Sequence, residues 1–550
     1  MISFFKKNFS LIILFSVLLI GIFFRFYRLS EFPVGFHVDE AINGVNGYFL
    51  LQTGRDSNNN KFPLQTEMFG DYNPTGYAYL ATIPIKIFGL TVFATRFPGA
   101  LLGSFSILAV FLLTYAIFLD KKTAILSSLF VAVSPWNIIL SRSSEQTLTA
   151  LFFVILGFSL TIFSLSRKQS LSFLISGMLV ISISFFIYFT PRVFVLLIFP
   201  ILFISFFNRI KQMNLRYKLV FTASFLLLIF LSFFLSVFLK GSENRFKQLS
   251  IFSFPETKLV MEEQIREDGV LGKNAMETRA FHNKLINYSL TYLSNYFEYF
   301  SANFLFLKGG LPPWLKVTGL GYIYLIELPF FIIGIINLIK NRDKKFWFVI
   351  LWLLIAPLTA AITVDETPNI RRSLVMFPAV EIISAYGLLV ILKNKKSFIR
   401  VFLSFFIGLI FIFNFAYFLH QYFGHEKVHR TWYRTNGMSK MIEEIKRVYN
   451  SYDKIIISKS QAMYPLILFY MKYDPKTYLA EGHTKDREYT GFGKFFFVPQ
   501  NCPIIDRNSR FPKAKHTLYV NSPECKDNQS VKYHDIYRED GTKAFKIAYD

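Results

Sequence analysis

The sequence predicts an all-α polytopic membrane protein of about 11–13 transmembrane helices with a small C-terminal extracytoplasmic α/β domain. Its 550 residues are 53% hydrophobic and only 17% charged, with 67 Phe. Ordinary soluble domains carry about 25% charged residues. Apolar stretches recur along residues 1–423, and clusters of Lys and Arg separate many of them. These three observations favour a helical membrane bundle.

About eleven stretches are apolar enough to cross a bilayer as helices. They are residues 9–25, 97–118, 123–140, 146–166, 171–190, 192–207, 218–239, 320–339, 346–363, 373–392 and 399–421. Residues 77–90 are apolar but short, with Pro84 and Lys86 inside, so we expect a helix at the outer surface. Lys6 and Lys7 precede the first stretch, but no small-residue cleavage site follows, so it is expected to remain as a span.

Loop charges predict the orientation. With the N-terminus inside, every short cytoplasmic loop is basic, as the positive-inside rule requires. These loops contain Lys121, Lys122, Arg167, Lys168, Arg209, Lys211, Arg216, Lys218, Lys340, Arg342, Lys344, Lys345, Lys393, Lys395 and Lys396. The net charge of +24 is explained by this placement, so no nucleic-acid partner is expected.

Three long segments consequently face outside: residues 26–95, residues 241–318 and the tail from about 424. We expect a multi-span domain over residues 1–423 and an extracytoplasmic α/β domain over residues 424–550. The tail alternates helix-like pieces with strand-like pieces at 454–458, 495–498, 517–520 and 544–548. Cys502 and Cys525, the only cysteines, lie there and are candidates for a disulfide. Two unpaired thiols in a reducing space are the alternative.

The outer side gathers acids and cations from loops that are far apart in sequence. Asp39 and Glu40 follow the first span closely, and a carboxylate pair beside a membrane marks a working site. The other candidates on this side are Asp71, Tyr72, Arg96, Arg142, Glu145, His282, Lys284, Arg371 and Arg372.

Such a collection suits group transfer from an anionic lipid. A carboxylate deprotonates an acceptor hydroxyl, while Arg and Lys hold a phosphate as it leaves. Each candidate also has a simpler interpretation: arginines as interfacial anchors, acids as solvated loop residues, and His282 as a loop hydrogen-bonding group. His and Cys show no metal-ligand spacing, so no cofactor is expected, but a divalent metal held by carboxylates stays open.

The first loop, opening with Val38-Asp39-Glu40-Ala41, is part of a recognisable series of motifs. The others are Thr53-Gly54-Arg55-Asp56, Phe69-Gly70-Asp71-Tyr72, Arg96-Phe97-Pro98, Ser134-Pro135-Trp136-Asn137, Ser141-Arg142, Phe281-His282-Asn283-Lys284 and Glu327-Leu328-Pro329-Phe330. In this order they resemble the GT-C class of polyprenyl-phosphate-sugar glycosyltransferases. That superfamily includes protein O-mannosyltransferases and lipid A aminoarabinose transferases, and the resemblance, over about residues 1–420, is to a bacterial branch of unassigned substrate.

The resemblance implies a GT-C-like bundle with a cavity open to the outer leaflet, where a lipid-linked sugar binds. It implies that Asp39 is the catalytic base, with Glu40 beside it, and that Arg96 and Arg142 contact the donor phosphate. Relatives commonly have Asp-Tyr-Lys-Pro-Pro where this chain has Asn73 after Tyr72. The missing Lys contact is expected from Lys284 or Arg371, or else the donor differs. The phosphate-binding set also includes His282 and Arg372. Asp71, Tyr72 and Glu145 are assigned to the acceptor or the sugar.

The leading hypothesis is an inverting hexosyl- or pentosyltransferase in the cell (inner) membrane, with its active site on the extracytoplasmic side. Its partners would be a polyprenyl-phosphate-linked sugar, membrane lipid, and a protein Ser or Thr, lipid or wall glycan as acceptor. The alternative is a flippase or transporter of a lipid-linked glycan. A third option is a wall-glycan polymerase or ligase. The sequence shows no inverted repeat and few ionisable residues inside the spans, which favours chemistry at the surface over transport.

Overall fold

The computed structural model describes residues 2–165, 170–239, 250–341, 343–393, 395–459, 463–481, 491–505, 516–527 and 531–549. These form two compact units. The bundle unit comprises Met1–Phe24, Leu102–Leu140 and Gln146–Phe418, and the loop–tail unit comprises Arg25–Leu101, Ser141–Glu145 and Leu419–Asp550. Among the predicted loop residues, Arg167, Lys168, Arg342 and residues 241–249 lie outside the described parts.

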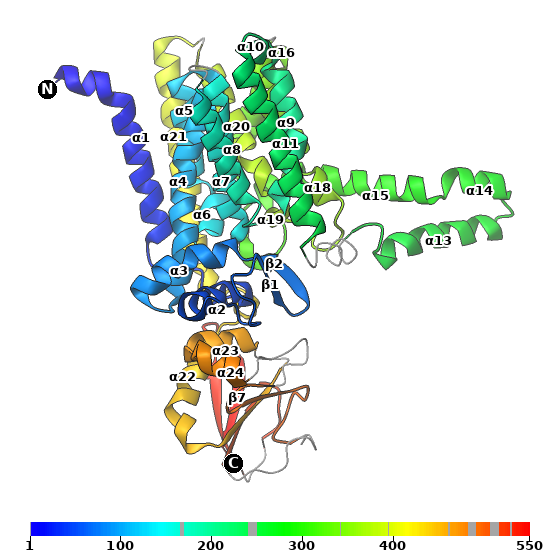
Figure 1. The fold of residues 1–550 in the computed structure, drawn as a ribbon. Helices are drawn as coiled ribbons and strands as arrows, with labels where there is room; N and C mark the ends of the chain where they lie inside the picture. Colours follow the sequence, from blue (N-terminus) through cyan, green and yellow to red (C-terminus); the bar gives the residue numbers. More distant parts are fainter. Residues whose placement is uncertain are drawn as a thin grey trace. The chain divides into compact units, whose positions relative to one another are not determined.

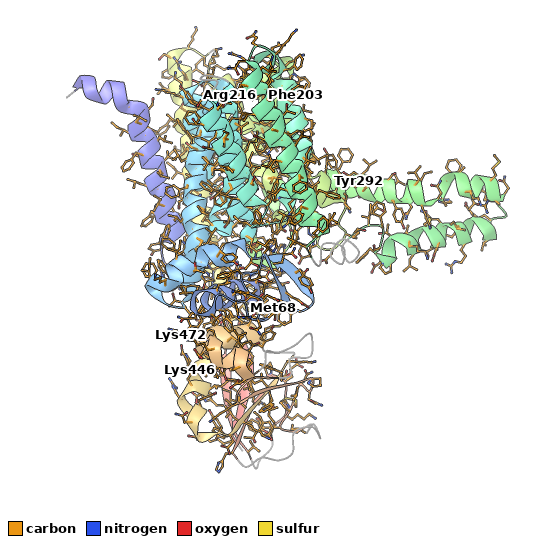
Figure 2. The ribbon with its side chains drawn as sticks, viewed as in Figure 1. Met68, Phe203, Arg216, Tyr292, Lys446 and Lys472 are labelled. Atoms are coloured by element: carbon orange, nitrogen blue, oxygen red, sulfur yellow. A yellow bond between two sulfur atoms is a disulfide. The ribbon has the colours of Figure 1, made fainter. Side chains whose placement is uncertain are left out.

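The bundle is built almost entirely from helices (Figure 1). They are α1 (Ile2–Phe26), α4 (Val92–Phe118), α5 (Lys121–Val133), α6 (Pro135–Ser141), α7 (Gln146–Phe163), α8 (Leu171–Ser184), α9 (Thr190–Ser205), α10 (Phe207–Lys211), α11 (Leu215–Val237), α16 (Glu327–Lys340), α17 (Lys344–Ile355), α18 (Leu358–Ala361), α19 (Ile370–Ser373), α20 (Phe377–Lys393) and α21 (Ser397–Phe423). In Figure 2 the labelled Phe203 of α9 and Arg216 of α11 lie at the same end of the bundle.

Local sequence sets where these helices begin and bend. The Asp120 side chain caps α5 by accepting hydrogen bonds from the backbone N–H groups of Lys122 and Thr123. Pro135 has no N–H and disfavours a helical residue before it, so α5 ends at Val133 and α6 continues at an angle of 55°.

The prediction of a polytopic helical membrane protein is confirmed. Within the described parts, seven helices are long and apolar enough to cross a membrane, or eight if α5 and α6 form one bent span. Each of the eleven predicted stretches overlaps a helix, but α8, α9 and α16 have only 14, 16 and 14 residues. A full crossing needs roughly 20, so full-length spans are fewer than predicted. The stretch 77–90 forms the separate helix α3 (Gly76–Phe88), whose position at a membrane surface stays a prediction.

A helical arm completes the bundle unit: α13 (Pro255–Val270), α14 (Ala275–Phe281) and α15 (Lys284–Glu298). The hydroxyls of Tyr292 (labelled in Figure 2) and Tyr296 on α15 donate to the carbonyls of Leu358 and Leu354, at 3.3 and 2.8 Å. This arm belongs to residues 241–318, which are predicted to face outside, and it is hydrogen-bonded near the end of α17 and the start of α18.

The loop–tail unit combines the C-terminal segment with the loop between α1 and α4, which is predicted to face outside and is called the first outer loop. Its elements are α2 (Val38–Thr53), β1 (Gln65–Met68), β2 (Asp71–Pro74), α3, α22 (Met438–Val448), β3 (Lys454–Ser458), α23 (Tyr464–Met471), α24 (Pro475–Glu481), β4 (Phe495–Val498), β5 (Thr517–Asn521), β6 (Lys532–Tyr537) and β7 (Lys543–Tyr549). The sheet order is β4-β3-β5-β7-β6; β3 is parallel to β4 and β5, and β7 is antiparallel to β5 and β6. The predicted C-terminal α/β domain is confirmed.

One apolar core joins the first outer loop to this sheet domain. Phe36 and residues of α2 and α3 pack in the same buried cluster as α22, α23 and strands β3 to β5. A Cβ at Gly44 of α2 would lie 2.7 Å from the Phe469 ring, so this close approach requires glycine. The compact units therefore do not coincide with the predicted division after residue 423. Cys502 and Cys525, the predicted pair, form a disulfide with Cα atoms 5.6 Å apart.

Small residues allow two helix pairs of the bundle to approach closely. A Cβ at Gly387 of α20 would overlap the carbonyl oxygen of Phe330 on α16, and one at Gly334 would overlap the Ile383 carbonyl. Gly157 of α7 and Gly177 of α8 face each other in the same way. Close backbone contact at small residues is a main source of helix association in membranes.

We expect Gly387→Ala to destabilise the bundle by about 1–3 kcal/mol, because the new methyl group meets backbone that cannot move aside. Thermal unfolding of the detergent-solubilised protein measures this. Gly408→Ala on α21 is the matched control, since a Cβ there meets nothing within 4 Å. Equal unfolding temperatures for the two variants would contradict the packing account.

Candidate functional site

The candidate site begins at the first turn of α2. His37 is the N-cap: its Nδ1 accepts a hydrogen bond from the backbone N–H of Asp39, at 3.2 Å. The Glu40 side chain in turn accepts from the backbone N–H of His37, at 3.3 Å. This reciprocal arrangement is a capping box, which satisfies N–H groups that the helix itself leaves unpaired. It fixes the directions in which Asp39 and Glu40 leave the helix.

The two adjacent acids have different environments. The side chain of Asp39 is 44% exposed, and its Oδ2 lies 3.7 Å from Nδ1 of His37. Glu40 is only 2% exposed. An exposed carboxylate is accessible to a substrate hydroxyl, whereas a buried one needs partners inside the protein.

Glu40 has two arginine partners. Nε of Arg96 lies 2.7 Å from Glu40 Oε2, and Nη1 of Arg434 lies 3.0 Å from Oε1. The backbone N–H of Ser144 also donates to Oε2, at 3.4 Å. Burial alone would raise the pKa of Glu40, but the two guanidinium groups outweigh it and hold that pKa below its ordinary value of 4.5. Glu40 is therefore an ionised carboxylate between two buried cations.

Arg96 is completely buried, and its remaining donors are used by backbone carbonyls. Nη1 donates to Leu29 at 3.2 Å and Pro33 at 3.1 Å, and Nη2 donates to Gly35 at 2.8 Å. The guanidinium also lies over the Phe36 ring, 5.6 Å from its centre. These contacts hold the segment between α1 and α2 in place.

Arg142 has the same kind of role at the end of α1. Its Nη1 donates to the carbonyl of Arg25 at 3.2 Å. Its Nη2 donates to those of Tyr27 at 2.6 Å, Arg28 at 3.3 Å and Phe32 at 3.2 Å. A cation at the carbonyl end of a helix is electrostatically favourable. The observed contacts of Arg96 and Arg142 are thus contacts within the protein, and their predicted contact with a donor phosphate stays a prediction.

Arg434 was not among the predicted site residues. This residue is 4% exposed, donates to Ser143 Oγ at 3.2 Å, and has Nε 3.9 Å from a carboxylate oxygen of Glu426. Its main partner, Glu40, is 394 residues away in sequence. No local pattern marks it, because its segment reads as one of many basic loops.

The predicted acceptor or sugar contacts also lie in the loop–tail unit. Asp71 and Tyr72 begin β2, just after a two-residue turn in which Phe69 and Gly70 have φ values of 56° and 77°. Positive φ at both positions is typical of a type I′ hairpin turn. Both side chains are half-buried, whereas Glu145 is 5% exposed.

The other predicted phosphate-binding residues belong to the bundle unit. Arg371 lies over the Trp314 ring, 5.9 Å from its centre, and Arg372 donates to Thr363 Oγ1 at 2.7 Å. His282 lies 3.4 Å from Asp268, and Lys284 is an exposed residue at the start of α15. The structure thus brings Asp39, Glu40, Arg96 and Arg142 together in one unit, and places Arg371, Arg372, His282 and Lys284 in the other. Among the described residues, no group of three or more His, Cys, Asp or Glu is arranged to hold a metal ion.

Several ionisable side chains are buried near the starts of bundle helices. Glu381 of α20 is fully buried and accepts a hydrogen bond from Trp136 Nε1 at 2.8 Å. Glu327, the first residue of α16, is 1% exposed. Arg192 of α9 donates to the carbonyls of Phe185 and Leu235, at 3.0 and 3.2 Å. Glu327, Arg192 and Glu381 lie within the first five residues of α16, α9 and α20, so the expectation of few ionisable residues in the middle of the spans stays a prediction.

Comparisons with known proteins agree with this architecture. Residues 72–236 match the family of dolichyl-phosphate-mannose-protein mannosyltransferases. The structure is similar to that of ArnT from Cupriavidus metallidurans bound to undecaprenyl phosphate, with a TM-score of 0.56, 11% identity and 98% of each chain covered. The chain has the GT-C glycosyltransferase fold.

A second GT-C relative is the oligosaccharyltransferase of Archaeoglobus fulgidus tethered to an acceptor peptide. The TM-score is 0.51 at 14% identity, over 85% of this chain and 63% of that one. The chain thus spans less than two thirds of the archaeal protein. The comparison with curated protein sequences gives no match. The GT-C-like fold that the resemblance implies is confirmed.

Glu40→Gln tests the charged cluster through its pH dependence. Because the pKa of Glu40 is lowered in the folded protein, its ionisation stabilises the fold above about pH 4.5, and this contribution is lost as the pH falls through the folded pKa. Near pH 7 we expect the variant to lose about 3–5 kcal/mol, since two buried cations lose their partner. Unfolding temperatures of the wild type and Glu40→Gln, measured from pH 7 to pH 3, should become more similar as the pH falls. If the difference between the two temperatures stays constant, Glu40 is not the ionised partner of the two arginines.

Arg142→Lys tests whether this side chain supports the end of α1. An ammonium group cannot reach four carbonyls with the geometry of a guanidinium, so we expect a loss of about 2–4 kcal/mol. Arg28→Lys is the control, because Arg28 is an exposed arginine whose side chain pairs with Glu31. The measurement is the unfolding temperature of each purified variant. If Arg142→Lys unfolds at the same temperature as Arg28→Lys, within error, Arg142 does not support the end of α1.

Proposed function

We propose that this protein is an inverting glycosyltransferase that moves a sugar from a polyprenyl-phosphate donor to an extracytoplasmic acceptor, with Asp39 as the base. The observation that carries the proposal is that two adjacent acids differ in burial and in ion pairing. Glu40 is buried and paired with Arg96 and Arg434, whereas Asp39 is half-exposed on the same helical turn. One carboxylate therefore organises the site and the other is accessible to a substrate.

The proposed step is a displacement at the anomeric carbon. The carboxylate of Asp39 takes the proton from the acceptor hydroxyl, and the acceptor oxygen forms a bond to the anomeric carbon. The bond from that carbon to the phosphate oxygen breaks, and polyprenyl phosphate leaves with the electron pair. Attack from the face opposite the leaving group inverts the anomeric centre.

The relatives support the donor class. One solved structure of ArnT holds undecaprenyl phosphate, and the matching family is described by dolichyl-phosphate mannose. A structure of the archaeal enzyme, with a TM-score of 0.50, contains dolichol phosphate and an inhibitory peptide. A polyprenyl-phosphate sugar as donor, with a peptide, lipid or glycan acceptor, follows by analogy of fold and family.

The roles of the predicted residues are refined within this proposal. Glu40, Arg96 and Arg142 act as positioning residues, since their observed contacts hold the first turn of α2 and the end of α1. Asp71, Tyr72 and Glu145 remain proposed contacts of acceptor or sugar. The phosphate roles of His282, Lys284, Arg371 and Arg372 rest on the sequence resemblance.

The proposed location is the cell (inner) membrane, with the acids on its extracytoplasmic side. The basic residues at the starts of α5, α11, α17 and α21 and the end of α20 support a cytoplasmic position for those helix ends. The disulfide between Cys502 and Cys525 supports an oxidising compartment for the tail.

Transport of a lipid-linked glycan is the second candidate, because Glu327 and Glu381 are buried in the bundle. Ionisable residues inside membrane proteins commonly mark a functional path. The two functions differ in product: a transferase joins the sugar to a new acceptor, whereas a flippase returns the donor unchanged.

Asp39→Asn should lower sugar transfer by about 10²–10⁴-fold, the usual contribution of a general base, while leaving the unfolding temperature near that of the wild type. Membranes containing the protein are incubated with radiolabelled polyprenyl-phosphate hexoses, and the labelled product is separated from the donor. Glu31→Gln, an exposed acid of the same loop, is the control. Transfer by purified Asp39→Asn at the wild-type rate would reject Asp39 as the base.

A further inference from the structure

The bundle unit contains an apolar groove that the proposed transfer reaction does not use. Its volume is about 660 Å³, within the range of roughly 300–1,000 Å³ that is usual for ligand sites. One face of α5 and one face of α21 form its length, with lining residues spaced by three and four positions from Lys122 to Val133 and from Ser404 to Phe415. The stacked rings of Phe130 and Phe411, 4.9 Å apart, join these two walls.

The lining changes along the groove. Near the first residues of α5, the last turns of α20 and residues 9–13 of α1 also line it. Towards Val133 and Phe415 the lining residues come from α5 and α21, and the Phe24 ring of α1 lies 4.8 Å from that of Phe415. The twelve residues from Lys122 to Val133 extend over about 17 Å of helix, which suits an extended hydrocarbon chain.

Positive charge gathers at the end of the groove where α5 begins and α20 ends. Lys122 lines the groove there, and Lys121 precedes it at the start of α5. Lys393 ends α20, and Lys396 directly precedes α21. All four are exposed. Basic pockets between membrane helices on the cytoplasmic side are the usual sites for anionic lipid headgroups.

Gly408 gives a second, independent observation. It lies in the middle of α21, lines the groove, and a Cβ at this position would meet no atom within 4 Å. Glycine in a helix interior costs about 0.5–1 kcal/mol relative to alanine. At Gly334 and Gly387 a neighbouring helix requires glycine, but no protein atom among the described residues requires it at Gly408. The space beside it is therefore available to a molecule other than the protein.

We propose that this groove binds an anionic glycerophospholipid of the bilayer. One acyl chain lies along α5 and α21 over Gly408, and the phosphate of the headgroup lies among Lys121, Lys122, Lys393 and Lys396. The polyprenyl-phosphate donor is a different lipid. The basic end of the groove includes Phe9 near the start of α1, whereas Asp39 follows the other end of that helix.

The test compares lipid retention by the purified full-length protein in detergent. Native mass spectrometry measures bound phosphatidylglycerol against phosphatidylcholine with the same acyl chains. We expect the wild type to retain one phosphatidylglycerol with about tenfold preference, and Gly408→Leu to lower that retention about tenfold by filling the groove. Lys121→Gln with Lys122→Gln should abolish the preference while leaving the protein folded, since both side chains are exposed.

Gly269→Leu is the matched control, because this exposed helical glycine on α13 also has open space around its Cβ. It should retain phosphatidylglycerol as the wild type does. The proposal is overturned if Gly408→Leu binds phosphatidylglycerol normally, or if the wild type does not distinguish the two headgroups. It is also overturned if added undecaprenyl phosphate displaces phosphatidylglycerol from the wild type, because the groove would then bind the donor class of lipid. If Gly408→Leu does not fold, the variant with both Lys121→Gln and Lys122→Gln tests the proposal. The proposal is overturned if this variant still prefers phosphatidylglycerol to phosphatidylcholine.

Discussion

The buried carboxylate of Glu40 is the constraint on which the loop–tail unit depends. It neutralises two buried arginines, Arg96 of α4 and Arg434 of the segment after α21. Removing one member of such a cluster leaves a buried charge without its partner, and that is strongly destabilising. Because its three members come from distant parts of the sequence, the cluster links the first outer loop, the start of the second long span and the C-terminal segment. The apolar core around Phe36 and Phe469 strengthens the same connection.

This constraint connects the fold to the proposed chemistry. The capping box of His37 and Glu40 fixes the first turn of α2, and the arginines hold Glu40 inward. The preceding residue, Asp39, then leaves the helix in a different direction and remains accessible to a substrate. A general base is effective only when its geometry is set before the reaction, so rigid support next to an exposed carboxylate is what such a site requires.

Much of the fold could be predicted from the sequence because membrane spans and tail strands have strong local patterns. All eleven apolar stretches correspond to helices, and the strands at 454–458 and 495–498 were placed correctly. Span lengths were less accurate, since Pro135 divides one predicted span and α16 begins only at Glu327. Strand β6 was missed because its residues are mostly polar and partly exposed. In the site, Asp39 and Glu40 were recognised together, but their different environments depend on Arg434, which no local pattern reveals.

A double-mutant cycle between Glu40 and Arg434 tests the central claim most directly. The free energies of unfolding of the wild type, Glu40→Gln, Arg434→Gln and the double variant are measured at neutral pH in the same detergent. A buried ion pair predicts a coupling energy of about 1.5 kcal/mol or more, so that the double variant is less destabilised than the sum of the two single variants. Additivity to within about 0.5 kcal/mol would show that the pair does not hold the unit together, and would contradict the account.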